Sequence, residues 1–118
     1  MHKIEINNLR KVIAVQKEFS EIFPHLRIDF HLKPHQSHGE NTPKMAKKTK
    51  LRIGDCRVHS HNGYLYLNEE MTVKEFKSYL TNEFGLAVEI FQKIEKGKWS
   101  KNPIYSNQLL AEINFEID

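Results

Sequence analysis

The sequence predicts an α+β two-layer sandwich, with two helices on one face of an antiparallel sheet. Three observations lead to this prediction: alternating apolar and polar residues over several short segments, two segments with helical apolar spacing, and a strand–helix–strand order that recurs after about 60 residues. Two such units favour a ferredoxin-like (split βαβ) arrangement with an added C-terminal strand. A β-grasp arrangement is the alternative, since a hairpin, a helix and further strands can be drawn from the second half.

Composition favours one small globular domain spanning residues 1–118. Hydrophobic residues make up 39% and charged residues 28% of the chain, which is enough apolar surface for a modest core. Cys56 is the only cysteine, which excludes an internal disulfide and is typical of a reducing compartment. The charged N-terminus lacks the apolar run of a signal peptide, and the longest apolar run, Val12 to Val15, is too short to span a membrane. We therefore expect a cytoplasmic protein with no membrane partner.

In the first half, Ile4 and Ile6 alternate with polar residues and predict a short strand. Asn7 and Asn8 offer N-cap oxygens for a helix that must end near Phe23, because Pro24 follows it. Alternation over 26–33 predicts the next strand.

In the second half, Thr72 and Glu75 form a capping box before a helix over Val73 to Phe84, and Gly85 suits a left-handed C-terminal residue. Strands are expected over 64–67 and 86–90, and Trp99 can begin a short return strand. Residues 51–58 fit either a weak strand or an irregular bridge. Alternation over 111–117 predicts a last strand, with a helix from Gln108 as the rival.

Positive charge gathers in one segment. Seven cations and two acids lie between Lys33 and Arg57, so this stretch carries 7 − 2 = +5 of a chain whose net charge is +3. We expect residues 34–50 to form a long flexible loop. Its lysines can contact the phosphates of a nucleic acid, or they can simply keep a solvated loop soluble; they are Lys44, Lys47, Lys48 and Lys50.

If two helices cover one side of a single sheet, then Arg27, Tyr64 and Tyr66 share the opposite side. Residues 62–67, Asn-Gly-Tyr-Leu-Tyr-Leu, resemble the third-strand core of the RNA recognition motif, and residues 4–9 are similar to its first-strand motif. The resemblance implies RNA bases stacked on the tyrosine rings and cations on the phosphates. Alternatively, the tyrosines are ordinary strand residues that a further strand or a partner covers.

Two clusters contain possible zinc ligands: His31, His35 and His38, and Cys56, His59 and His61. Pro34 separates members of the first cluster, and no Cys-x-x-Cys pair exists, so we interpret the histidines as residues of exposed loops and expect no metal or cofactor. For catalysis, the sequence offers a possible thiolate–imidazole pair of Cys56 with His59 or His61. The hypothesis is therefore a non-catalytic protein-interaction or adaptor domain, which can self-associate; the alternative is nucleic-acid binding.

Overall fold

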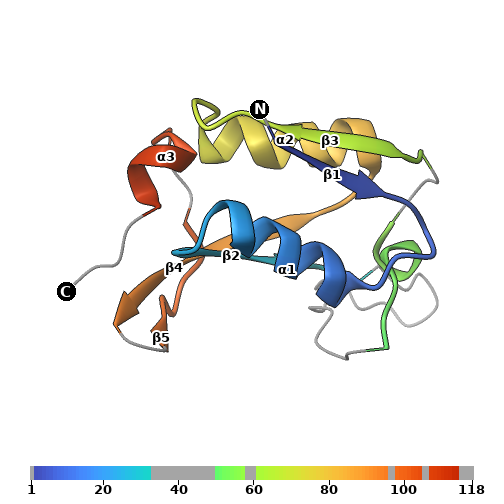
Figure 1. The fold of residues 1–118 in the computed structure, drawn as a ribbon, viewed down its shortest axis with the longest axis horizontal. Coiled ribbons are helices and arrows are strands. Elements are labelled where there is room, and N and C mark those ends of the chain that lie inside the picture. Colours follow the sequence, from blue (N-terminus) through green and yellow to red (C-terminus); the bar gives the residue numbers. More distant parts are fainter. Residues whose placement is uncertain (1, 33–49, 58–60, 96–97, 105–106, 115–118) are drawn as a thin grey trace, which may run out of the picture.

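The computed structural model describes residues 2–32, 50–57, 61–95, 98–104 and 107–114 (Figure 1). The elements follow the chain as β1 (His2–Ile6), α1 (Val12–Ile22), β2 (Leu26–Phe30), the 3₁₀ helix η2 (Ile53–Cys56), β3 (Gly63–Leu67), α2 (Val73–Phe84), β4 (Val88–Glu95), β5 (Lys98–Trp99) and α3 (Leu110–Ile113). The predicted α+β class is confirmed.

Strands from the two halves of the chain pair with each other. β1 pairs antiparallel with β3, with Ile4 opposite Leu65. β2 pairs antiparallel with β4, with Ile28 opposite Ile90, and β5 extends this second sheet beside β4. Each strand–helix–strand unit therefore contributes one principal strand to each sheet.

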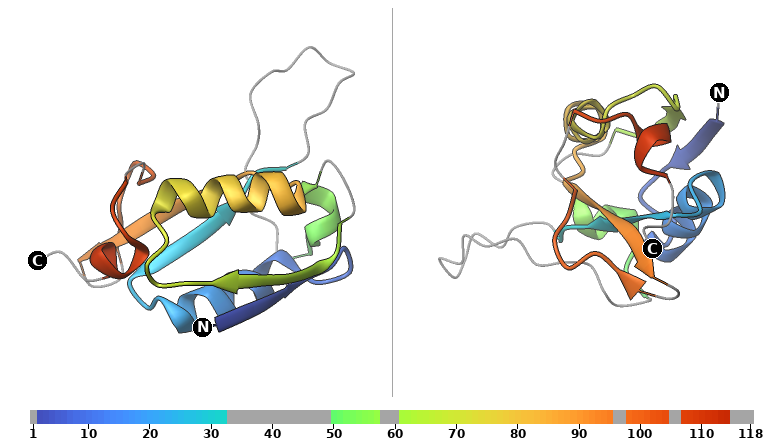
Figure 2. Two further views of the ribbon diagram at one scale, coloured as in Figure 1. Left: turned by 90° about the horizontal axis from the view of Figure 1, so that it is seen from above. Right: turned by 90° about the vertical axis from the view of Figure 1, so that its left-hand side faces the viewer.

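The two sheets lie on opposite sides of one core. Helices α1 and α2 cover the remaining sides of this core (Figure 2). Phe19 of α1 contacts Phe76 of α2 with a ring-centroid distance of 5.6 Å, so the helices meet through the core. Apolar residues that alternate along the predicted strands are buried in the core: Leu26, Ile28, Leu65, Leu67, Val88 and Ile90. Their burial confirms the alternation read from the sequence.

Helix α2 has the predicted bounds and caps. The Glu75 amide donates to Thr72 Oγ1 at 3.0 Å, and the Thr72 amide donates to a Glu75 carboxylate oxygen at 3.3 Å. At the other end Gly85 has φ 66° and ψ 28°, the left-handed conformation that glycine adopts without a Cβ clash.

Helix α1 ends as expected, but its start differs. The Phe23 amide donates to Phe19 O at 2.9 Å, and Pro24 then stops the helix. The helix begins at Val12, whereas Asn7 Oδ1 accepts hydrogen bonds from the amides of Leu9 and Arg10. The asparagine oxygen thus caps a turn that precedes the helix.

The prediction of a single sheet is wrong for the described strands. The first strands of the two halves, β1 and β3, form one sheet, and the second strands, β2 and β4, belong to another. The β-grasp alternative fails at the same point, since β3 pairs with the N-terminal strand β1. Residues 51–57 are the described part of the segment 51–58. There η2 lies between isolated bridges of Arg52 with Lys11 and of Arg57 with Leu86, as the irregular-bridge interpretation expected.

The added C-terminal strand is wrong for the described residues up to 114, where the rival helix is found instead. Glu112 stands at the third position of α3 and accepts a hydrogen bond from the Leu109 amide at 3.0 Å. The Leu110 amide bonds to Met71 O at 2.8 Å and holds α3 against the start of α2. Residues 115–118 lie outside the described part of the chain.

Candidate functional site

Two tyrosines stand out on the outer face of the β1–β3 sheet. Tyr64 and Tyr66 are 47% and 49% exposed, although both belong to a strand whose other side is buried. Tyr64 lies opposite Glu5 and Tyr66 lies opposite Lys3 in the register of the two strands. The Lys3 ammonium is 4.7 Å from the centroid of the Tyr64 ring, a cation–π contact.

In the other sheet, the outer side of β2 and the side of β4 away from β2 are both occupied. On β2, Gln16 Nε2 donates to Ile28 O at 2.8 Å and Ser20 Oγ donates to Leu26 O at 3.2 Å, so α1 satisfies the strand's outward carbonyls. On β4, the Ile104 amide donates to Ile90 O at 2.7 Å, and β5 pairs further along the strand. Neither edge is open to a further strand over these positions.

The outer edge of β1 is also partly closed. Arg10 Nη1 donates to Glu5 O at 2.9 Å. The guanidinium is held in place by Glu18, which forms an ion pair with it, and this hydrogen-bonded carboxylate raises the pKa of Arg10. The same contact shows that the Glu5 carbonyl points away from β3.

That orientation identifies the backbone groups on the free side of β3. In an antiparallel pair, residues that bond to each other alternate with residues whose N–H and C=O both point away. Because Glu5 points away from β3, its partner Tyr64 points away from β1, and Tyr66, two residues on, does the same. Within the described residues, no hydrogen bond satisfies these four outward backbone groups.

The composition of β3 does nothing to protect this edge. Its five residues, Gly-Tyr-Leu-Tyr-Leu, include neither a charge nor a proline. Proteins usually place Lys, Pro or a bulge on an open strand to prevent pairing with another chain. Figure 1 shows β3 at the top of the molecule with β1 beneath it, and Figure 2 shows α2 running beside β3 on the side away from β1. We call the outward backbone groups and side chains of Tyr64 and Tyr66 the β3 edge.

The predicted partner of the tyrosines lies elsewhere. Arg27 belongs to β2, in the other sheet, so the expectation that all three residues share one face is wrong. Its guanidinium pairs with Asp29 at 3.0 Å and stacks 4.6 Å from the Phe91 ring centroid and 5.2 Å from that of Trp99. The alternation of side chains correctly predicted that each of these three residues lies on the outer face of its own sheet. It does not specify which strands are neighbours.

Most of the basic loop and three of the five histidines in the predicted clusters lie outside the described residues. Lys44, Lys47 and Lys48 lie outside the described residues, as do His35, His38 and His59, whereas Lys50 and His61 are described and exposed. His31 bonds to Glu89 at 3.2 Å, and Lys77 contacts the same carboxylate at 3.2 Å. In the part of the chain that the structure describes, no three acidic, histidine or cysteine side chains are grouped to hold a metal.

Cys56 does not have the properties of a nucleophile. Cys56 is the last residue of η2 and its side chain is buried. Burial, assisted by the charge of Asp55, raises the pKa of Cys56 to about 11. The thiol therefore remains protonated at neutral pH, whereas thiolate is the reactive form and the form that binds zinc.

Sequence reasoning missed Arg57, which is only 3% exposed. Its Nε donates to Phe84 O at 2.9 Å, and its Nη1 donates to the side-chain oxygens of Asn8 and Asn62 at 3.0 and 2.8 Å. Burial lowers the pKa of Arg57. The residue joins the end of α2 to the segments before α1 and β3, and nothing in the local pattern distinguishes it from a surface arginine.

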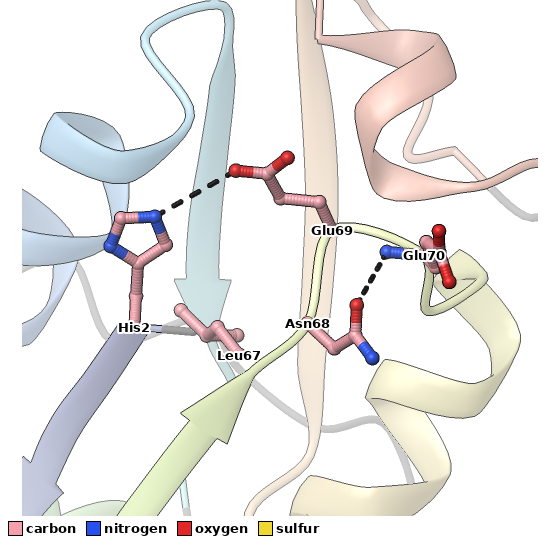
Figure 3. A pocket seen from close by; sticks show the side chains of 5 residues that line it. All are labelled: His2, Leu67, Asn68, Glu69 and Glu70. Carbon is pink, nitrogen blue, oxygen red and sulfur yellow. Dashed lines mark hydrogen bonds and ion pairs between the residues drawn. The ribbon is translucent and has the colours of Figure 1, made fainter.

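An open hollow of about 350 Å³ lies where β3 ends and β1 begins, and Figure 3 shows its lining. His2 Nε2 faces Glu69 Oε1 at 3.7 Å, and both side chains are about half exposed or more. Asn68 accepts a hydrogen bond from the Glu70 amide at 2.9 Å, which is the bond of a turn. The hollow is a solvated strand end with a surface contact between His2 and Glu69, and none of its five lining residues offers a buried polar group to a ligand.

No helix among the described residues is long and apolar enough to cross a membrane. Comparisons of the chain with protein-family models, curated proteins and solved structures each returned no match.

Proposed function

We propose that this chain is a small non-catalytic interaction domain that binds an extended segment of a protein partner by adding it as a strand along the β3 edge. The open side of β3 carries the proposal. Strand addition uses unpaired backbone N–H and C=O groups for affinity and flanking side chains for specificity. Tyr64 and Tyr66 supply both, since their outward backbone groups and half-exposed rings lie together.

Contrast with the other strands supports this choice of surface. β2 and β4 have their outer edges occupied by α1 and by the segment 98–104, and Arg10 closes β1 at Glu5. Tyrosine also suits a binding surface, because it offers a large amphipathic contact with few rotatable bonds.

Selection of binding peptides from a random displayed library, with the full chain as bait, tests the proposal. Peptides that bind should slow hydrogen exchange at the amides of Tyr64 and Tyr66. Leu65 and Leu67 should already exchange slowly in the free protein, because their amides bond to β1.

Tyr66→Pro is the matched variant, since proline removes the outward N–H and is tolerated on a strand edge. It should weaken peptide binding by roughly tenfold or more, whereas Tyr66→Thr, which keeps the N–H and favours strands, should weaken it less. Peptides that bind both variants equally and protect neither tyrosine amide would exclude the β3 edge as the site.

Nucleic-acid binding is the second candidate, favoured by the half-exposed tyrosines and by Lys3 above the Tyr64 ring. Glu5 beside Tyr64 opposes it, because its carboxylate repels phosphate. If the protein binds single-stranded RNA, Tyr64→Ala and the pair Lys47→Glu with Lys48→Glu should each lower retention on poly(U), and binding should fall as salt rises. Unchanged retention in both variants would exclude this use of the surface.

A further inference from the structure

We infer that the strand which occupies the β3 edge is β3 of a second copy of this chain, in an antiparallel, twofold-symmetric pair centred on Leu65. This inference rests on the proposed function, because it names the partner that the open edge binds. The two two-stranded sheets would join into one continuous sheet in the order β1–β3–β3–β1.

Backbone geometry supports a second copy. The outward groups of β3 belong to Tyr64 and Tyr66, which flank Leu65 symmetrically. A twofold axis at Leu65 places Tyr64 opposite Tyr66 of the second copy, and Tyr66 opposite its Tyr64. Each such pair exchanges two N–H···O=C bonds, so the same four groups on each copy satisfy one another and none is left over.

Side chains on the outer face agree with this register. In the single copy, Lys3 lies opposite Tyr66 and Glu5 lies opposite Tyr64. Across the joined sheet, each of the two central rows then reads Lys3–Tyr66–Tyr64–Glu5, with the last two residues from the second copy. The two tyrosines of a row form a cross-strand aromatic pair, and the ends of each row carry opposite charges, so no like charges face each other.

Sedimentation of the full chain over about 1 µM to 1 mM measures the dimer directly. The wild-type chain should form a dimer in this range, and the amides of Tyr64 and Tyr66 should gain protection from hydrogen exchange as the concentration rises. Tyr66→Pro should raise the dimer dissociation constant by roughly tenfold or more, since each dimer loses two N–H donors.

A charge pair tests the register without proline. Because residue 64 faces residue 66 of the second copy, Tyr64→Glu with Tyr66→Glu places like charges opposite each other and should abolish the dimer. Tyr64→Lys with Tyr66→Glu places opposite charges in the same positions and should restore it. Both double variants alter exposed side chains only, so circular dichroism and thermal unfolding should show that both fold.

A wild-type chain that stays monomeric at about 1 mM would overturn the inference, as would a dimer that responds equally to both double variants. Neither result would contradict the proposed function if selected peptides still protect the amides of Tyr64 and Tyr66 from exchange and if their binding still depends on the amide of residue 66. Peptides that protect neither tyrosine would count against the proposed function itself, and the two failures are therefore distinguishable.

Discussion

Single residues of this protein owe their chemistry to burial more than to type. Cys56 is the only cysteine of the chain and was a candidate nucleophile beside His59 or His61. Its burial raises the pKa of Cys56 to about 11, which makes it a small apolar side chain at neutral pH.

The raised pKa of Cys56 predicts a loss of stability at alkaline pH. The ordinary pKa of a cysteine thiol is 9.0, whereas burial raises the pKa of Cys56 in the folded protein to about 11. The buried, protonated thiol therefore makes its full contribution to the free energy of unfolding below the unfolded pKa. This contribution is lost as pH rises through the folded pKa. Urea unfolding at several pH values between about 8 and 11 should show this decline, and Cys56→Ala should show a shallower one because other groups titrate there too. Equal slopes would contradict the assignment.

Arg57 is expected to matter more to stability than its distance from the β3 edge suggests. Arg57→Lys keeps the charge but cannot bond at once to Phe84 O, Asn8 and Asn62, so it should lower the free energy of unfolding by roughly 1–3 kcal/mol. Arg52→Lys is the control, because Arg52 is exposed and its side chain bonds to Leu9 O alone among described carbonyls. Chemical denaturation with equal losses in both variants would refute this role.

At the scale of elements, local signals are strongest in α2. Thr72 and Glu75 complete a capping box, and Gly85 ends the helix in the left-handed conformation. These signals act within a few residues of each other, which is why the bounds Val73–Phe84 could be predicted.

Thr72→Ala should therefore cost about 1 kcal/mol of stability, since the Glu75 amide loses its acceptor. Thr72→Ser retains the hydroxyl and should recover most of the loss, while Ser78→Ala, on the exposed side of α2, should be neutral or slightly stabilising. Thermal unfolding of the three variants measures the difference. A serine variant as unstable as the alanine variant would show that the cap is not the cause.

The whole molecule is an interleaved pair of similar units. Ile4 pairs with Leu65, an offset of 65 − 4 = 61 residues, and Ile28 pairs with Ile90, an offset of 90 − 28 = 62 residues. α2 begins at Val73, also 73 − 12 = 61 residues after the start of α1 at Val12. Among the described residues, the ladders β1–β3 and β2–β4 both join the two units, and the ladder within a unit is that of β4 with the two-residue strand β5.

A peptide of residues 1–32 should therefore be largely unfolded on its own, because β1 and β2 both lack their partners. Its far-ultraviolet circular dichroism should show little strand and only marginal helix, since α1 has 11 residues. The full chain should unfold in one cooperative transition. A folded peptide, or two separate transitions in the full chain, would contradict the interleaved architecture.

The sequence by itself determined which side of each strand is buried, where α2 begins and ends, and that two strand–helix–strand units follow one another. These properties depend on contacts within a few residues, such as Thr72 with Glu75, or on an alternation that is visible within Gly63–Leu67. Only the tertiary structure decided that β1 pairs with β3, that Arg27 lies in the other sheet, and that no described residue bonds to the outward backbone groups of Tyr64 and Tyr66. The reason is that strand pairing joins residues about 60 positions apart, and alternation of side chains is the same whichever strand lies alongside.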